Sequence, residues 1–346
     1  GAPRIEGLAT ALPPHRYPQE TIYEEFLVPR LGENRLARAA FMNADIAYRH
    51  SVLGDGRFYD ADPTMEERNN LFMAHAQPLG AEAVRAALAN AGLAPQDIDD
   101  LIVVSCTGLD TPGLDLLLAG ELGMRHDLRR TLIGAMGCYA AFPGLHRAAS
   151  SVLARPGTHA LLLCVELCTL HFQRDRGLDN LVSTALFADG AAAVVLSDSP
   201  GPGPRLLDQR TYCDYQTLEH MAFHLTDHGF RMVLSAYVPE VLRAHAAQRV
   251  DQLLAPNRLQ RGEIRFWGIH PGGARILDFL QAELALTERQ VEPSRRVLRE
   301  RGNMSSPTVL FVLEEIMRQG EPQPGDYGVL MAFGPGLTLE TALLRW

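Results

Sequence analysis

Short runs of continuous apolar residues recur along the chain and are separated by longer stretches of mixed polarity. The runs LIVVSC at 101–106, HALLLCVEL at 159–167 and AAAVVLSD at 191–198 contain few charged side chains. A continuous apolar run of this length is typical of a β-strand that is buried on both faces. We predict further strands at 131–138, 264–270, 327–333 and 338–346.

The stretches between these strands carry apolar residues at helical spacing. The longest covers 65–92, with an expected interruption near Pro78 and an end at Gly92, a residue suited to the position after a helix. Further helices are predicted at 113–123, about 139–154, 236–255, 273–285 and 304–318. Buried strands that alternate with helices predict a parallel or mixed sheet covered on both faces.

A Pro- and Gly-rich segment, PGPGP at 200–204, divides this pattern into two parts. The part that follows it is a variation on the order of strands and helices that precedes it. The sequence therefore predicts a layered α/β fold of two duplicated halves, with residues 1–199 in the first and residues 200–346 in the second.

The composition excludes several classes of chemistry. With 47% hydrophobic and 21% charged residues, the chain of 346 residues is typical of a soluble globular protein. Its 32 basic residues are all Arg, which excludes Schiff-base catalysis, a pyridoxal-phosphate anchor and a P-loop, because each needs a Lys amine. The formal charge of −9 argues against broad nucleic-acid binding, which requires a basic face.

No segment indicates export, a membrane or a metal. Residues 1–7 lack the basic and apolar regions of a signal peptide, and no apolar run reaches about 18 residues. An odd number of cysteines, five in a long chain, predicts reduced thiols and a cytoplasmic location. Cys164 and Cys168 lie four residues apart without downstream partners at zinc spacing, so we expect no metal site.

The motif IGAMGCYAAF places Cys138 between a predicted strand and an Ala-rich helix. A thiol there faces the free backbone amides of a helix N-terminus, whose partial positive charge favours the thiolate. Gly137 permits a tight turn that exposes the sulfur. Cys138 is therefore a candidate nucleophile, although a small buried Cys that packs like an apolar residue fits the same pattern.

Two later motifs carry polar side chains at similar positions. In WGIHPGGARILD, His270 ends a predicted strand, and Gly272 and Gly273 allow the backbone to approach a ligand closely. In RGNMSSPTVLFVLEEI, Asn303 precedes a predicted helix and could direct its amide into a cavity. The simpler alternatives are a core histidine at 270 and a helix N-cap at Asn303.

Taken together, Cys138, His270 and Asn303 favour acyl transfer through a thioester. An imidazolium stabilises a thiolate, and imidazole and carboxamide donors stabilise a developing oxyanion. Papain-like proteases carry the same three residue types in the same order. However, the sequence that surrounds their Cys is missing here, and the alternation of strands and helices does not suit their fold.

Six motifs resemble those of the type III polyketide synthases, the chalcone and stilbene synthase superfamily within the thiolase fold. They extend from about residue 40 to the C-terminus and are SCTGLDTPG, MGCYA, ALFADGAAAVV, IHPGGARILD, RGNMSSPTVLF and FGPGLTLET. The resemblance implies a bacterial-type homodimer with a thiolase-like five-layer αβαβα fold. It also implies an acyl-CoA starter, extension with malonyl-CoA, and no metal or redox cofactor.

The resemblance also implies roles for individual residues. Cys138 matches the nucleophile that holds the starter and the growing polyketide, and His270 and Asn303 match the pair that binds the malonyl thioester carbonyl. Phe187 matches one of two aromatic residues between the CoA tunnel and the cavity. Met232 stands where the second aromatic residue, a Phe, is usual, so we expect a flexible Met to reshape this junction.

The remaining matches concern the cavity and the CoA tunnel. The implied cavity positions are Cys168, His171, Ser305, Gly272, Gly273, Pro335 and Gly336, with Thr111 in place of a Met that often reaches into the partner's cavity. Because the chain has no Lys, Arg35 and Arg38 are the candidates for binding the CoA phosphates. Solvated surface arginines would give the same pattern.

Two alternatives to a type III polyketide synthase remain. A ketoacyl carrier-protein synthase III shares the fold and the three residues but usually performs one condensation. The Gly334-Pro335 turn favours the polyketide synthase, because the other enzyme more often carries a Gly-Gly pair there. An inactive thiolase-fold scaffold that binds acyl-CoA is the second alternative, and the presence of all three residues argues against it.

Overall fold

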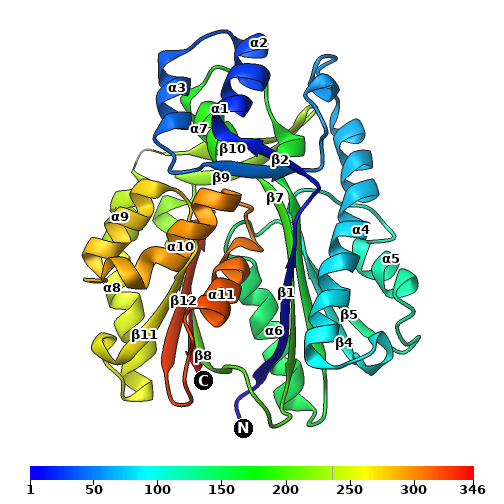
Figure 1. The fold of residues 1–346 in the computed structure, drawn as a ribbon, viewed down its shortest axis with the longest axis vertical. Helices are drawn as coiled ribbons and strands as arrows, with labels where there is room; N and C mark the ends of the chain where they lie inside the picture. The colour runs from blue at the N-terminus through cyan, green and yellow to red at the C-terminus, as the bar shows by residue number, and fades with distance from the viewer. Residues whose placement is uncertain (236) are drawn as a thin grey trace.

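Each half of the sequence forms part of one nine-stranded sheet in the computed structural model, which describes residues 1–235 and 237–346 (Figure 1). The first half contributes β1 (Arg4–Ala11), β4 (Asp100–Val104), β5 (Arg129–Ile133), β6 (Ala160–Leu167) and β7 (Asp189–Ser197). The second half contributes β8 (Arg205–Cys213), β11 (Ile264–Ile269), β12 (Tyr327–Gly334) and β13 (Thr338–Arg345). The strand order across the sheet is β11-β12-β13-β8-β1-β7-β6-β4-β5.

The same pattern of strand pairing occurs in both halves. In the first, β4 is parallel to β6, β6 is antiparallel to β7, and β7 is antiparallel to β1. In the second, β11 is parallel to β12, β12 is antiparallel to β13, and β13 is antiparallel to β8. The two half-sheets meet at a single pair, Arg4 with Arg205. The Pro- and Gly-rich segment lies in the connection between β7 and β8.

Helices cover both half-sheets and fill the space between them. Between the half-sheets lie α6 (Ala141–Ala154) and α11 (Thr308–Gln319), which contact strands of both halves (Figure 1). The first half-sheet is covered outside by α4 (Met65–Ala91) and α5 (Leu114–Glu121). The second is covered by α8 (Val238–Leu254), α9 (Ala274–Glu283) and α10 (Glu288–Arg301). These layers form the five-layer αβαβα arrangement, as predicted.

A smaller group of elements caps one end of the sheets (Figure 1). Its helical parts are α1 (Gln19–Thr21), the π-helical turn η1 (Ile22–Leu27), α2 (Val28–Leu31), α3 (Arg35–Met42) and α7 (Leu178–Leu186). Two hairpins complete it: β2 (His15–Pro18) with β3 (Tyr48–Ser51), and β9 (Met221–Thr226) with β10 (Gly229–Leu234). Single turns of 3₁₀-helix are η2 (Arg57–Tyr59), η3 (Pro95–Asp97), η4 (Cys168–His171), η5 (Tyr215–Thr217), η6 (Ala255–Asn257) and η7 (Arg261–Glu263).

Some predicted boundaries were wrong. The strand expected at 131–138 is the edge strand β5, whose side chains are only partly buried and which ends at Ile133. Its extension is prevented by the positive φ angles of Ala135 (57°) and Gly137 (89°). The helix expected to be interrupted near Pro78 continues through that residue, because a single proline removes only one hydrogen bond from a long helix packed on three strands.

The helix predicted at 236–255 corresponds to α8, which begins at Val238; residue 236 itself lies outside the described residues. The helix predicted at 304–318 begins later, at Thr308. Among the described residues, no helix is long and apolar enough to cross a membrane. No three His, Cys, Asp or Glu side chains in the same residues come together in a way that could hold a metal ion.

Candidate active site

The turn that carries Cys138 is packed against a turn from the other half of the chain. Cys138 lies just before α6, and only 4% of its surface is exposed. A Cβ atom on Gly137 would lie 2.7 Å from the ring of Pro335, so only Gly fits there. A Cβ atom on Gly334 would lie 3.4 Å from the backbone nitrogen of Cys138. The Gly334-Pro335 turn therefore forms one wall around the thiol.

Asn303 is held by the strand-like segment that contains Phe187. The Asn303 N–H donates to the carbonyl of Leu186 (2.9 Å), and the Ala188 N–H donates to the carbonyl of Asn303 (2.9 Å). Its side-chain oxygen accepts from the Ser305 N–H (2.8 Å), and hydrogen bonding from the Asn303 side chain lowers the pKa of the Cys138 thiol. The alternative of a helix N-cap is wrong, because α11 begins five residues after Asn303.

His270 is a fully buried imidazole at the end of β11. The backbone N–H of His270 donates to the carbonyl of Met331 on β12 (2.8 Å), and the imidazole ring lies edge-on to Phe333 with 5.5 Å between the centroids. Met331 and Phe333 lead into the Gly334-Pro335 turn beside Cys138. Neither ring nitrogen has a hydrogen-bond partner among the described residues. An unpaired buried polar group destabilises the fold by about 1–3 kcal/mol, so this imidazole is suited to bind a group that substrate supplies.

Burial disfavours the charged forms of both side chains. It raises the pKa of Cys138 to about 11, although hydrogen bonds from Ser305 and Asn303 act in the opposite direction. Burial alone lowers the pKa of His270 to about 3. The imidazolium expected from the sequence is therefore not the resting form of His270, and a charged imidazole there requires a thiolate beside it.

Next to Cys138 lies a hydrogen-bonded cluster around Glu166 that sequence analysis did not identify. The buried Glu166 carboxylate accepts from the Cys106 N–H (3.0 Å) and from the hydroxyls of Thr107 (2.7 Å) and Ser306 (2.6 Å). The Cys106 sulfur lies 3.8 Å from the hydroxyl of Ser305. A signal was present in the sequence, because Glu166 is the one acidic residue in the apolar run HALLLCVEL.

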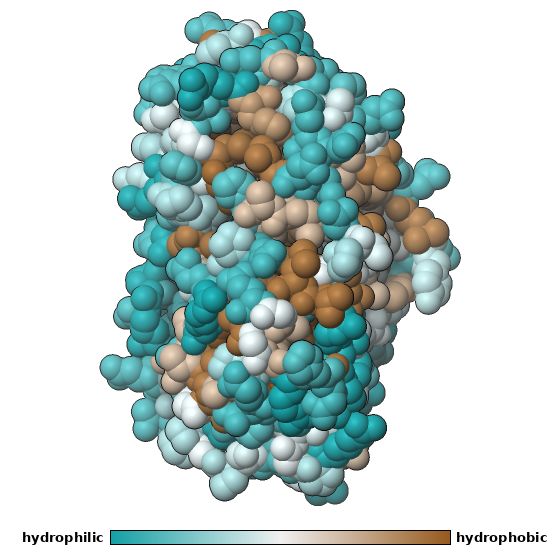
Figure 2. All heavy atoms as spheres, turned by 90° about the vertical axis from the view of Figure 1, so that its right-hand side faces the viewer, coloured by the Kyte–Doolittle hydropathy of each residue, from teal (hydrophilic) through white to brown (hydrophobic). Residues whose placement is uncertain are grey.

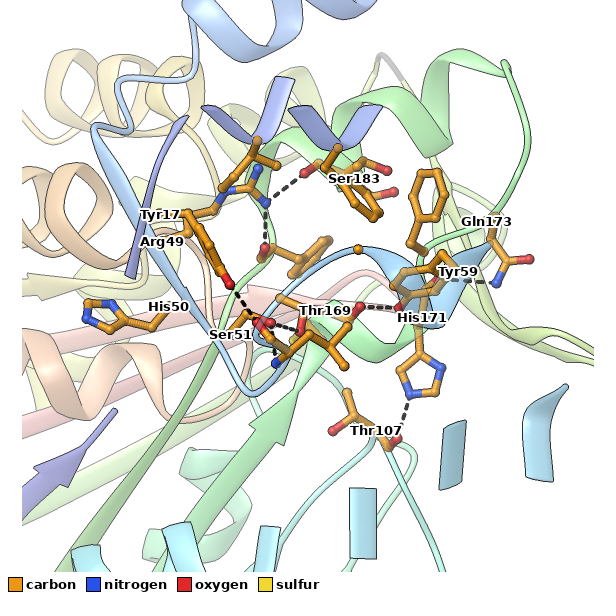
Figure 3. Close-up of a pocket in the computed structure, with 18 of the residues that line it drawn as sticks. Tyr17, Arg49, His50, Ser51, Tyr59, Thr107, Thr169, His171, Gln173 and Ser183 are labelled. Carbon is orange, nitrogen blue, oxygen red and sulfur yellow. Dashed lines mark hydrogen bonds between the residues drawn. The ribbon is translucent and has the colours of Figure 1, made fainter. Parts of the chain in front are cut away.

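A cavity of about 340 Å³ opens beside this cluster (Figure 3). Among the residues predicted for it, Phe187, Met232, Cys168, His171 and Ser305 contribute to its lining. Its inner end is formed by Cys106, Thr107 and Ser305, and Ser305 also reaches the Cys138 thiol.

Other predicted residues lie outside the cavity lining. Gly272 lies against Phe333, since a Cβ atom there would be 2.7 Å from that ring, and Gly273 precedes α9 beside Leu186. Pro335 packs on Gly137, and Gly336 has a φ of 121°, which a turn permits for Gly.

Thr111 is exposed on the side of the molecule that carries α5. Arg35 and Arg38 are exposed on α3 and form no ion pair within the described chain.

Besides Phe187, the cavity lining contains a second aromatic residue near Met232. This residue, Phe223, was missed by sequence analysis. Phe223 lies directly opposite Met232 in the β9/β10 hairpin, and its ring is 6.1 Å from the ring of Phe187. Side chains of directly opposed residues lie on the same face of a hairpin. Phe187 and Phe223 thus form an aromatic pair in the cavity lining, with the second ring supplied by the strand that neighbours Met232.

Arg49 holds the backbone beside the aromatic pair of Phe187 and Phe223. Its buried guanidinium donates to the carbonyls of Thr184 and Phe187 (both 2.7 Å) and to the side chain of Gln19 (2.8 Å). A Cβ atom on Gly302 would lie 2.9 Å from the Arg49 side chain, so the residue before Asn303 must be Gly. Arg49 thus links the backbone of Phe187 to the backbone that positions Asn303.

His171 connects the cavity floor to the hairpin that carries Phe223 and Met232. Its Nε2 donates to the carbonyl of Thr107 (2.6 Å), and its Nδ1 accepts from the Phe230 N–H (3.2 Å). Only the neutral imidazole can make both bonds, and burial lowers the pKa of His171 to about 4. His171 is therefore a neutral structural contact in the cavity wall.

The chain is similar to known proteins over nearly its whole length. The sequence model described as "Chalcone and stilbene synthases, N-terminal domain" matches residues 1–200, and that of the C-terminal domain of the same family matches residues 211–346. The chain is 37% identical over 351 residues to 1,3,6,8-tetrahydroxynaphthalene synthase from Streptomyces peucetius subsp. caesius. The alignment covers 99% of this chain and 93% of that protein. It is 36% identical over 359 residues to 3,5-dihydroxyphenylacetyl-CoA synthase from Streptomyces toyocaensis, covering 99% and 90%.

Solved structures give the same result. The structure of 1,3,6,8-tetrahydroxynaphthalene synthase from Streptomyces coelicolor A3(2), a bacterial type III polyketide synthase, superposes with a TM-score of 0.94 at 30% identity, covering 99% of each chain. The structure of PKS-I from the brown alga Ectocarpus siliculosus superposes with a TM-score of 0.93 at 33% identity, covering 99% of this chain and 98% of that one.

Proposed function

The chain belongs to the chalcone and stilbene synthase family and is a type III polyketide synthase with the thiolase-like fold, and we propose that Cys138, His270 and Asn303 perform its chemistry. The observation that carries this proposal is the convergence on one thiol: Asn303 and Ser305 both direct hydrogen-bonding groups at Cys138. The unpartnered imidazole of His270 lies on the strand end beside the same turn.

The first step is the transfer of a starter acyl group from CoA to Cys138. The neutral imidazole of His270 takes the thiol proton as the sulfur attacks the thioester carbonyl. The carbon–sulfur bond to CoA breaks, and the CoA thiolate takes the proton back from the imidazolium. The products are an acyl-Cys138 thioester, free CoA and a neutral His270.

The second step is the decarboxylation of malonyl-CoA. Loss of CO₂ leaves an enolate, whose oxygen accepts hydrogen bonds from the imidazole N–H of His270 and the amide NH₂ of Asn303. The enolate carbon then attacks the acyl carbonyl on Cys138, and the Cys138 thiolate leaves. The Cys138 thiolate takes up one proton from solvent, and the extended β-ketoacyl-CoA then returns to Cys138 by the exchange of the first step, so extension is iterative. These steps balance without a metal or redox cofactor, and we propose that the enzyme uses none.

The relatives suggest the type of product. Two of them are named for 1,3,6,8-tetrahydroxynaphthalene and for 3,5-dihydroxyphenylacetyl-CoA, which are phenolic compounds. We propose that this enzyme likewise cyclises its chain to a phenolic compound or a pyrone. The match of both halves to the chalcone and stilbene synthase family leaves the ketoacyl carrier-protein synthase III and the inactive scaffold without support.

Arg35 and Arg38 remain the proposed ligands of the CoA phosphates. Both lie on α3, which packs against α7, and α7 ends directly before Phe187 at the cavity entrance. Neither side chain is neutralised by an acidic partner in the described residues. Two unpaired guanidinium groups near the entrance suit a phosphate-bearing substrate.

The proposed proton exchange predicts a pH effect on the reactivity of Cys138. In His270→Gln the thiolate forms only by loss of the proton to solvent, so alkylation by iodoacetamide should rise about tenfold per pH unit from pH 7 toward the pKa of about 11. In the unaltered enzyme the imidazole accepts the proton, so alkylation at pH 7 should be faster and less dependent on pH. Peptide mapping after labelling measures the rate at Cys138.

His126→Gln is the matched control, because His126 is an exposed histidine remote from the site. It should keep the pH profile of the unaltered enzyme. Identical profiles for His270→Gln and the unaltered enzyme would show that no proton passes between Cys138 and His270.

A second copy of the chain is the proposed partner, and we propose a cytoplasmic location. The side of the molecule with α4, α5 and the edge strand β5 carries apolar surface across its middle (Figure 2). Leu109 and Leu132, 70% and 41% exposed, line a hollow of about 150 Å³ on this side. An exposed apolar hollow beside an open strand edge is suited to a protein interface. Thr111 is exposed near this hollow, which fits its implied place at the subunit boundary.

Light scattering coupled to gel filtration tests the dimer. The enzyme should elute with twice the chain mass of 38.0 kDa. Leu132→Asp should shift the mass to that of a single chain, because a carboxylate would be buried in an apolar contact. Leu153→Asp, at an equally apolar and 60% exposed position near the end of α6, should remain dimeric. A single-chain mass for the unaltered enzyme would refute the proposal.

A further inference from the structure

We propose that the buried carboxylate of Asp189 sets the hydrogen-bonding polarity of two hydroxyls in the cavity wall, and that Ser51 is the residue through which it acts on the bound ketide chain. The hydroxyl pair consists of Ser51 and Thr169, which both line the cavity (Figure 3). Asp189 is fully buried behind them at the start of β7. The inference deepens the proposed function and rests on it, because it places the thioester end of the chain at Cys138.

Asp189 fastens two segments of the cavity wall to β7. One carboxylate oxygen, Oδ1, accepts from the backbone N–H of Thr169 (2.8 Å) in η4. The other, Oδ2, accepts from the hydroxyl of Thr169 (2.7 Å) and from the backbone N–H of Val52 (2.9 Å), the residue after β3. All three groups donate to the carboxylate, so the ionised form of Asp189 suits this position.

The ionised carboxylate fixes the direction of both hydroxyl protons. Because it can only accept, Thr169 donates its hydroxyl proton to Asp189. The hydroxyl oxygens of Thr169 and Ser51 are 2.8 Å apart, so Ser51 donates to Thr169. The Ser51 oxygen also accepts from the Leu53 N–H (3.0 Å). Since its one proton is used inside the protein, Ser51 offers the cavity an acceptor and no donor.

Protonation of Asp189 reverses this direction. A proton on Oδ2 has the Thr169 oxygen as its acceptor at 2.7 Å, so Thr169 turns its own proton toward Ser51. Within the described residues, the Ser51 oxygen then accepts from Thr169 and from the Leu53 N–H and has no acceptor for its own proton. The Ser51 proton therefore points into the cavity, where a ketide carbonyl can accept it.

The charge of Asp189 changes within the range in which its neighbours keep theirs. Burial raises the pKa of Asp189 to about 6, although its hydrogen bonds and the charge of Arg49 on β3 act in the opposite direction. In the described chain, Arg49, Tyr59 and Cys168 face this carboxyl. Arg49 stays charged, because burial lowers its pKa only to about 9. Tyr59 and Cys168 stay neutral, because burial raises the pKa of each.

The hydroxyl pair lies along the wall that leads away from the nucleophile. Cys168, which precedes Thr169, is close enough to Cys138 for a thiolate there to raise the pKa of Cys168. The wall that continues from Cys138 past Cys168 therefore leads to this pair. A ketide chain carries a carbonyl at every second carbon, and a carbonyl buried without a donor is disfavoured. The charge of Asp189 thus decides whether such a carbonyl is held at Ser51.

Equilibrium binding tests this inference without turnover. The probes are hexanoyl-CoA and 5-oxohexanoyl-CoA, which have equal chains and differ by one carbonyl. In Cys138→Ala, which cannot be acylated, the Kd of the oxo thioester divided by that of hexanoyl-CoA should fall about three- to tenfold from pH 7.5 to pH 5, the usual effect of gaining one hydrogen bond. Titrations that affect both ligands equally cancel in this ratio. Equal ratios at the two pH values would refute the inference.

Two substitutions should remove the pH dependence of the ratio when they are introduced beside Cys138→Ala. Asp189→Asn removes the titrating carboxyl, and Ser51→Ala removes the hydroxyl that meets the carbonyl of the ligand. A retained dependence in either folded variant would show that another group titrates and would overturn the proposal. Because Asp189 is fully buried, Ser51→Ala, at the cavity surface, decides the question if Asp189→Asn does not fold.

Each substitution has a matched control. Asp100→Asn alters an equally buried carboxylate on β4, which accepts from the Ser151 hydroxyl (2.5 Å). Ser183→Ala removes a different lining hydroxyl, which donates to the Asn180 carbonyl (3.1 Å). Both variants should keep the pH dependence, and its loss in either would contradict the assignment to Asp189 and Ser51. Absence of acyl labelling at Cys138 in the unaltered enzyme, with the pH-dependent ratio retained, would instead refute the catalytic assignment.

Discussion

Cys138→Ala is expected to abolish both acyl transfer and product formation. The acyl group must be held as a thioester, and an alanine methyl group can form no bond to it. Cys106 is poorly suited to replace Cys138, because its thiol donates to the Glu166 carboxylate (3.3 Å), and burial, followed by that charge, raises its pKa well above the ordinary value. Incubation with radiolabelled acyl-CoA should give no covalently labelled protein.

Cys213→Ala is the control for this loss. Cys213 ends β8, where its sulfur accepts a hydrogen bond from Thr338 (3.7 Å), and it lies outside the cavity lining. This variant should bind the label and form product as the unaltered enzyme does. Peptide mapping should place the label on Cys138, and a label carried by Cys106 would contradict the assignment of the nucleophile.

The predictable part of the fold is the part in which local pattern and burial agree. Strands such as β6, in which every residue is buried, appear in the sequence as apolar runs and were located to within one residue. β8 was not predicted, because its sequence RLLDQRTYC is largely polar and partly exposed. Its extended form depends on pairing along its length with β13, which no local pattern reveals.

The cap elements escaped prediction for the same reason. The hairpin β9/β10 has a mixed pattern and is stabilised by contacts with α7 and η4, which are distant in sequence. Phe223 could not be placed beside Phe187 before the register that sets it opposite Met232 was known.

In the candidate site, residue type and local turn could be predicted, but protonation could not. Cys138 and Asn303 were identified from strand–helix junctions, and the structure brings them together. The expected imidazolium at His270 depends on solvent access, and the complete burial of this ring favours the neutral form. Glu166 was overlooked, although an acidic residue within a fully buried strand indicates a paired polar cluster.

Asn303→Ala and His270→Gln are expected to lower the decarboxylation of malonyl-CoA by about 10²–10³-fold each, the usual effect of removing one donor from an oxyanion site. The expected loss is large because both groups are buried, at 2% and 0% exposure, where water cannot replace the missing hydrogen bond. Release of labelled CO₂ from malonyl-CoA measures this step without a starter.

The rate of acyl loading in Asn303→Ala is the comparison for its rate of decarboxylation, because the enolate that Asn303 binds forms only in the second step. Asn303→Ala removes one of the two side chains that lower the pKa of the Cys138 thiol, and Ser305 and a backbone hydrogen bond remain, so loading should decrease far less than decarboxylation. A parallel decrease in both steps would mean that Asn303 acts through the nucleophile alone. Full decarboxylation by either variant would remove that residue from the enolate site, and the enolate would then require a donor other than the two side chains that converge beside Cys138.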